Sequence, residues 1–195
     1  MPKFRNLLAA AVVIAGAVPA AAQVGSLSDG TLNMGQKVEQ APQPVGPAGA
    51  NVEKMGDWNL VCPEDTTQQL PCRLVQLMND DQGAPVSEIT IVKFATPRGP
   101  AVAAANIIVP LETLLLEQLT ISVDGENPTR YPFSYCNKVG CVVELGLAEA
   151  DIEAMKTGGE ANIVIVPAIA PDSVVNVNMS LSGFTAAYDK AAAAN

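Results

Sequence analysis

The stretch Val174-Val-Asn-Val-Asn-Met-Ser-Leu-Ser182 alternates apolar and polar residues with a period of two. Successive side chains of a β-strand point to opposite faces, so this alternation predicts a strand with one face in a core and the other in water. Between about Met55 and Tyr188 the other apolar runs are also short, rich in β-branched residues and separated by turn residues. This region is therefore typical of a mainly β protein.

Further strands are expected at 58–62, 72–78, 87–94, 101–109, 118–123, 130–135, 141–145 and 162–166, with turns at Asp124-Gly125 and at 81–83. One short helix is expected at 148–157, where Ile152 and Met155 would face the core and Gly158-Gly159 would end the helix in the left-handed conformation. Many short strands with one small helix favour an antiparallel β-sandwich, immunoglobulin-like in type, over a βαβ fold.

The chain has four cysteines and no histidine. Three pairings of the four are possible, and loop entropy alone would favour a long link from Cys62 to Cys141, at about 4–5 kcal/mol, over the short links at about 2–3 kcal/mol. Short loops close most readily, which favours Cys62–Cys72 and Cys136–Cys141. A zinc site is the alternative, but the spacing of the first pair is not that of zinc ligands.

Residues 1–22 read as a cleavable signal peptide, with Lys3 and Arg5 before an apolar run and the small residues Ala20-Ala21-Ala22 after it. The apolar run is too short for a transmembrane anchor, so no integral membrane span is expected after cleavage. Residues 23–54 contain much Gly, Pro and Ala, and we expect a flexible leader. Residues 55–190 then form one domain. The later apolar stretch 101–119, interrupted by Asn106, Pro110, Glu112 and Glu117, is assigned to its core.

The formal charge of the chain is −9, and cleavage would make it −11 because Lys3 and Arg5 leave. Nucleic acid is therefore a poor expectation as a partner, since binding to phosphates depends on clustered Lys and Arg. The acidic balance is read as a property that keeps an exported protein soluble.

Five segments together resemble the invasion-associated locus B family: Gly56-Asp-Trp-Asn-Leu-Val-Cys62, Cys72-Arg-Leu-Val-Gln76, Val123-Asp-Gly125, Tyr135-Cys-Asn-Lys-Val-Gly-Cys141 and Leu181-Ser-Gly-Phe-Thr-Ala-Ala-Tyr188. Their order and spacing match across nearly the whole domain. The resemblance implies a small disulfide-bearing β-sandwich, exported by alphaproteobacteria and held at the envelope or released. It also implies a link to host-cell invasion in pathogens, with no established enzyme activity.

The sequence offers two kinds of candidate group for catalysis. Paired carboxylates occur at Glu64-Asp65, at Asp80-Asp81 and on the expected helix, where solvated charges are the ordinary outcome. A serine nucleophile lacks a histidine base, and the G-x-S-x-G and phosphate-loop motifs are absent from the sequence. We therefore expect no catalytic residues, no metal and no cofactor.

Aromatic side chains lie just before the second cysteine bracket and could bind a partner. The candidate interaction loop is the Cys136–Cys141 bracket with its flank, because a disulfide lowers the entropy lost when a loop docks; its residues are Tyr131, Phe133, Tyr135, Asn137 and Lys138. Trp58 is assigned to the core. Phe184 and Tyr188, four residues apart, suit a short terminal helix.

The expected function is that of an exported, non-enzymatic interaction protein with an envelope or surface protein as its partner. It would reside in the periplasm or the outer envelope, or be secreted, after cleavage. The alternative is a periplasmic module that binds a small ligand or stabilises the envelope under stress.

Overall fold

The computed structural model describes residues 49–65, 70–80 and 82–193. The expected signal peptide and residues 23–48 of the leader lie outside them. The strands of the described part are β1 (Ala50–Met55), β2 (Trp58–Pro63), β3 (Arg73–Asp80), β4 (Pro85–Arg98), β5 (Ala101–Val109), β6 (Leu119–Val123), β7 (Glu126–Tyr131), β8 (Tyr135–Cys136), β9 (Cys141–Ala148), β10 (Glu160–Ile165) and β11 (Val175–Ser180). The helices there are η2 (Leu115–Glu117), α1 (Glu149–Thr157) and α2 (Phe184–Lys190).

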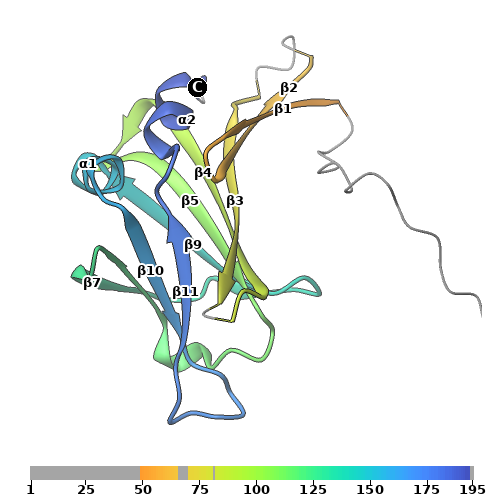
Figure 1. The fold of residues 1–195 in the computed structure, drawn as a ribbon, viewed down its shortest axis with the longest axis vertical. Helices are drawn as coiled ribbons and strands as arrows, with labels where there is room; N and C mark the ends of the chain where they lie inside the picture. Colours follow the sequence, from red (N-terminus) through yellow and green to blue (C-terminus); the bar gives the residue numbers. More distant parts are fainter. Residues whose placement is uncertain (1–48, 66–69, 81, 194–195) are drawn as a thin grey trace, which may run out of the picture. The chain divides into compact units, whose positions relative to one another are not determined.

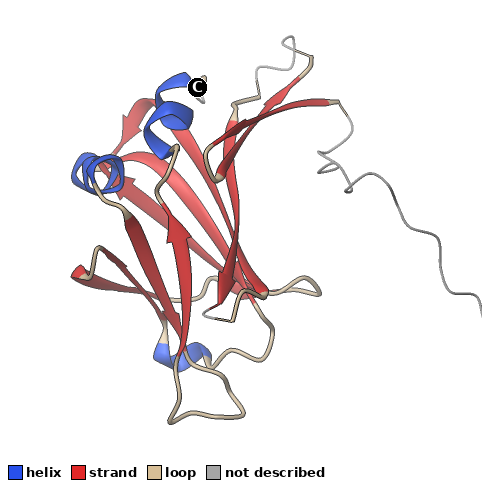
Figure 2. Ribbon diagram, viewed as in Figure 1, coloured by secondary structure: helices blue, strands red, loops and turns tan. Residues whose placement is uncertain are grey.

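The strands form one antiparallel, 11-stranded sheet in the order β7-β6-β10-β11-β3-β4-β5-β9-β8, with the β1–β2 hairpin also paired to β3 (Figure 1). The prediction of a mainly β, antiparallel protein is thus confirmed. The immunoglobulin-like sandwich is not confirmed, because continuous strand pairing joins its two expected sheets into a single half-barrel. Figure 2 shows the helices at the ends of this sheet.

The core lies on the inner face of the sheet, where alternate residues of the strands are buried. In β11 the buried residues are Val177 and Met179, as the alternation predicted, and β5 and β10 show the same pattern. The largest fully buried side chain is that of Trp58, which packs against Phe184 at 5.3 Å between ring centroids. The assignment of Trp58 to the core is confirmed.

The sheet branches at β3. One half of β3 pairs with β2 and the other half with β11, whose backbone pairing to β3 is limited to two residue pairs. Beyond that point the buried amide of Gln76 replaces the missing strand partner: its Nε2 donates to the Ser180 carbonyl at 2.8 Å, and its Oε1 accepts from the Ser180 N–H at 2.9 Å. The Trp58 indole also donates to that carbonyl, so the branch leaves none of these polar groups unpaired.

Several element boundaries differ from the sequence-based predictions. Residues 50–54 are expected in the flexible leader but belong to β1, which is fully paired with β2. The strand was missed because four of its six side chains are exposed and three of these are polar, which leaves no apolar alternation to recognise. The expected strand at 130–135 is split between β7 and β8.

The expected helix at 148–157 is α1, with Ile152 and Met155 buried as predicted. Its end was predicted wrongly, because Gly158 has φ −75° and is not left-handed. A Cβ at Gly158 would instead crowd Val123 and the Ala154 carbonyl, so glycine is required there for close packing. The terminal helix suggested by Phe184 and Tyr188 is α2, a second helix beside the one counted in the fold class.

Candidate functional site

Both favoured cysteine pairings are present, as Cys62–Cys72 and Cys136–Cys141. The first links β2 to the residue that precedes β3, and the second closes the β8–β9 turn. Within that turn the Asn137 side chain accepts a hydrogen bond from the Val139 N–H at 2.8 Å. Gly140 is buried against the Val109 carbonyl, where a Cβ would clash. The turn is therefore firmly attached to the end of β5.

The five residues of the candidate interaction loop differ in how far their side chains are buried. Tyr131 and Phe133 are half-buried and pack against the core. Tyr135, Asn137 and Lys138 are exposed, and Asn137 is engaged in the turn. The candidate residues thus differ in exposure, because β7 ends at Tyr131 and the chain is irregular until β8 begins at Tyr135, so no single strand aligns their side chains.

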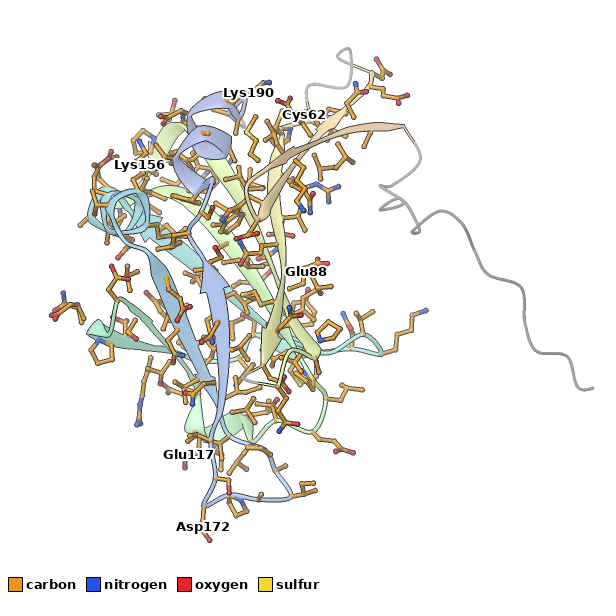
Figure 3. The ribbon with its side chains drawn as sticks, in the orientation of Figure 1. Cys62, Glu88, Glu117, Lys156, Asp172 and Lys190 are labelled. Carbon is orange, nitrogen blue, oxygen red and sulfur yellow. A yellow bond between two sulfur atoms is a disulfide. The ribbon has the colours of Figure 1, made fainter. Side chains whose placement is uncertain are left out.

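Two longer loops lie at the same end of the sheet as the β8–β9 turn. The β5–β6 loop and the β10–β11 loop hydrogen-bond to each other through Leu114 N–H to Val166 O and Ala168 N–H to Glu112 O, both at 2.7 Å. A Thr113–Pro167 bridge lies between these bonds. Figure 3 shows Glu117 and Asp172, one from each loop, at this end.

These loops expose large apolar side chains. Leu116 is 89% exposed and Ile169 is 83% exposed. We name the exposed apolar residues of the three loops the loop surface; they are Leu111, Leu115, Leu116, Val139, Ile169 and Val174. The assignment of 101–119 to the core is therefore wrong for Leu111, Leu115 and Leu116, whereas Leu119 is fully buried as expected. The signal in the sequence was the placement of three leucines between Glu112 and Glu117 after a proline, which interrupts the period of the preceding strand.

A cavity of about 370 Å³ opens on the inner face of the half-barrel, between α1 and the β6–β7 hairpin. Figure 1 shows α1 and β7 at the same margin of the sheet. The floor is apolar and comes from β4, β5, β9 and β11, with Ile89, Ala105, Ile107, Leu145, Leu147 and Met179. This cavity was not predicted from the sequence, because the residues of its floor have the same apolar pattern as ordinary core residues.

The rim of the cavity is polar and acidic. Asp124, Glu126 and Asp151 line it, and there is no Lys or Arg among its lining residues. Two of these carboxylates also support the walls. Asp151 accepts from the Ala148 N–H at 2.7 Å, and Asp124 accepts from the N–H groups of Gly159 and Glu160.

Tyr131 joins this rim from β7. Its burial, and secondarily the negative charge of Asp151, raise the pKa of the Tyr131 phenol above its ordinary value. The phenol is therefore neutral at physiological pH and contributes no charge to the rim.

The paired carboxylates weighed for catalysis are dispersed. Asp80 accepts from the N–H groups of Gln82 and Ala84 in the β3–β4 turn, while Glu153 lies 3.7 Å from Lys156 on α1. Across residues 49–65, 70–80 and 82–193, no three metal-binding side chains gather into a cluster. A search of the same residues finds no helix of the length and apolarity that crossing a membrane requires.

Fold and site together define a disulfide-bearing, mainly β half-barrel with an inner cavity and apolar end loops. The family model for the invasion-associated locus B (IalB) protein matches residues 58–192. The chain belongs to the invasion-associated locus B family, and the resemblance seen in the sequence is confirmed.

A solved structure agrees with the fold. The crystal structure of invasion-associated protein B from Bartonella henselae matches with a TM-score of 0.60 and 22% identity, covering 72% of this chain and 94% of that one. A search of curated proteins finds no significant match.

Proposed function

We propose that this chain is an exported, non-enzymatic protein of the cell envelope that binds another protein through its loop surface. The observation that carries the proposal is the exposure of Leu116 and Ile169 on two loops that are hydrogen-bonded to each other. Large apolar side chains gathered at one end of a molecule mark interaction sites, and a preordered loop loses little entropy on docking. The signal-like residues 1–22 and the family membership support export to the envelope.

The partner that fits this surface is a protein with an apolar groove flanked by basic side chains. The three loops carry the acidic residues Glu112, Glu117 and Asp172, and Lys138 is their single basic residue. An anionic membrane surface would repel these carboxylates, and a second copy of the chain would oppose like charges. A basic rim on a different protein would pair with them.

In-cell crosslinking of the tagged protein, followed by mass spectrometry and envelope fractionation, tests the proposal. We expect a reproducible crosslinked envelope or surface protein, and we expect the double variant Leu116→Ser with Ile169→Ser to lose it. The matched control is Leu77→Ser, which removes a leucine that is 60% exposed on β3. Retention of the product by the loop variant, or its absence from the wild type, would overturn the proposal.

A second candidate function, periplasmic binding of a small ligand, is supported by the cavity under α1. It needs a different face of the molecule and is compatible with partner binding at the loops.

A further inference from the structure

The cavity has the features of a small-molecule site. Its volume of about 370 Å³ lies at the lower end of the range for ligand pockets, and its floor is apolar while polar groups gather at the mouth. No part of the proposed partner binding uses these residues. The cavity is therefore separate from the loop surface.

The walls are held open by contacts that are independent of any ligand. The β6–β7 turn is fixed to the start of β10 by the Asp124 carboxylate, at 3.0 Å from the Glu160 N–H. On the opposite wall, α1 is capped by Asp151 and buries Ile152 and Met155. Because both walls are anchored, the space between them is preformed, and a ligand would need little rearrangement to enter.

The distribution of polarity indicates the chemistry of the occupant. Isoleucine, leucine, alanine and methionine side chains of the floor would accept an alkyl chain. At the mouth, the carboxylates of Asp124, Glu126 and Asp151 give a negative potential that no lining Lys or Arg offsets. Arg130 lies between Thr129 and Tyr131 on β7, and these two neighbours line the cavity while Arg130 does not. This alternation places the basic side chain on the other face of the strand.

We propose that the cavity binds a small amphiphile with one alkyl chain and a cationic, phosphate-free ammonium head group. The chain lies on the apolar floor, and the head group lies among the three carboxylates at the mouth. A fatty acid has the same chain with the wrong charge. A phosphocholine lipid carries the ammonium group, but its phosphate would face the same carboxylates.

Methionine methyl groups provide the readout. Met155 and Met179 line the cavity, whereas Met78 is buried outside it. Octyltrimethylammonium is titrated into the mature protein with isotope-labelled methionine methyls, and NMR follows their shifts. We expect saturable shifts at Met155 and Met179 with little change at Met78. Octanoate and octylphosphocholine, with the same chain length, are expected to bind about tenfold more weakly.

Two variants and one matched control test where the ligand binds. Ala154→Phe adds bulk on α1 at the mouth, at an exposed position whose hydrogen bonds are made by the backbone, and it is expected to abolish the shifts. The matched control, Ala186→Phe, enlarges an exposed alanine of α2 outside the cavity and should bind as the wild type does. Glu126→Gln removes one rim charge and is expected to weaken octyltrimethylammonium about threefold.

Absence of saturable shifts at Met155 and Met179 overturns the proposal, as do unchanged shifts in the Ala154→Phe protein. Equal binding of octanoate overturns the charge assignment, and equal binding of octylphosphocholine overturns the restriction to phosphate-free head groups. None of these results bears on the loop surface, so this inference and the proposed partner binding fail separately.

Discussion

At the scale of single residues, the first and the last of the family segments are joined by a close contact between two turns. The β1–β2 turn and the turn before α2 pack backbone against backbone, with the Asp57 N–H donating to the Ser182 carbonyl at 3.1 Å. The Asp57 carboxylate accepts from the Ser180 hydroxyl at 2.6 Å. Gly56 and Gly183 both have positive φ, and a Cβ on either would clash with the opposing backbone. Each of these two segments therefore requires a glycine, because a side chain on either one would clash with the backbone of the other, although they are more than a hundred residues apart in the chain.

Gly183→Ala should lower the free energy of unfolding by about 3 kcal/mol or more, because strain at φ +85° adds to the clash with the Met55 carbonyl. Gly99→Ala is the matched control: its φ is +62° and nothing lies within 4 Å of the added Cβ, so only strain of about 1–2 kcal/mol is expected. Urea denaturation of both variants measures the difference. An equal decrease in the free energy of unfolding for the two variants would show that the packing between the two turns does not contribute to stability.

At the scale of elements, the disulfides attach peripheral pieces of chain to the sheet. Cys62–Cys72 ties the β1–β2 hairpin to β3, where only three residue pairs join β2 to β3. Cys136–Cys141 holds the two-residue strand β8 against β9. Each bond lies where strand pairing is short, and the bracket spacing in the sequence was enough to favour both pairings.

Replacing either cysteine pair by alanine should cost about 2–3 kcal/mol, since a short closed loop loses its constraint on the unfolded chain. Strong reductant acting on the unmodified protein should have the summed effect of several kcal/mol. Denaturation with and without reductant, alongside a thiol assay, gives the values. If unfolding is unchanged while all thiols are shown to be free, the stabilising effect of the disulfides is refuted.

At the scale of the whole molecule, β3 is the hub of the sheet. It pairs with β2, β4 and β11, whereas β7 is an edge strand that pairs only with β6 and has almost entirely exposed side chains. Local opening costs least where few apolar groups are buried. The half-barrel thus has a stable centre and a weakly held margin beside the cavity.

Hydrogen exchange should reveal this gradient. The comparison leaves out the peripheral strands β1, β2 and β8. Among the remaining strands, the amides of β3, β4 and β5 are expected to exchange slowest and those of β7 fastest. Mass spectrometry of peptides that cover each strand resolves them. Exchange in β7 as slow as in β5 would show that the margin opens only with the whole sheet.

Local patterns in the sequence were sufficient for most of the elements, although they missed β1 and joined parts of β7 and β8 into one strand. Alternation predicted most strands, helical spacing predicted α1, and cysteine spacing favoured the pairings that the structure contains. These properties depend on residues near one another in the chain, so they can be read without the fold.

Tertiary structure alone decided how the elements join and what they expose. Strand pairing of β11 with β3, completed by Gln76, makes one half-barrel in place of two sheets. The same closure leaves the cavity beneath α1, and loop-to-loop hydrogen bonds hold Leu116 and Ile169 in water. These features depend on contacts between segments that are distant in the chain. The sequence alone does not determine whether an apolar residue will contact another side chain, line a cavity or face solvent.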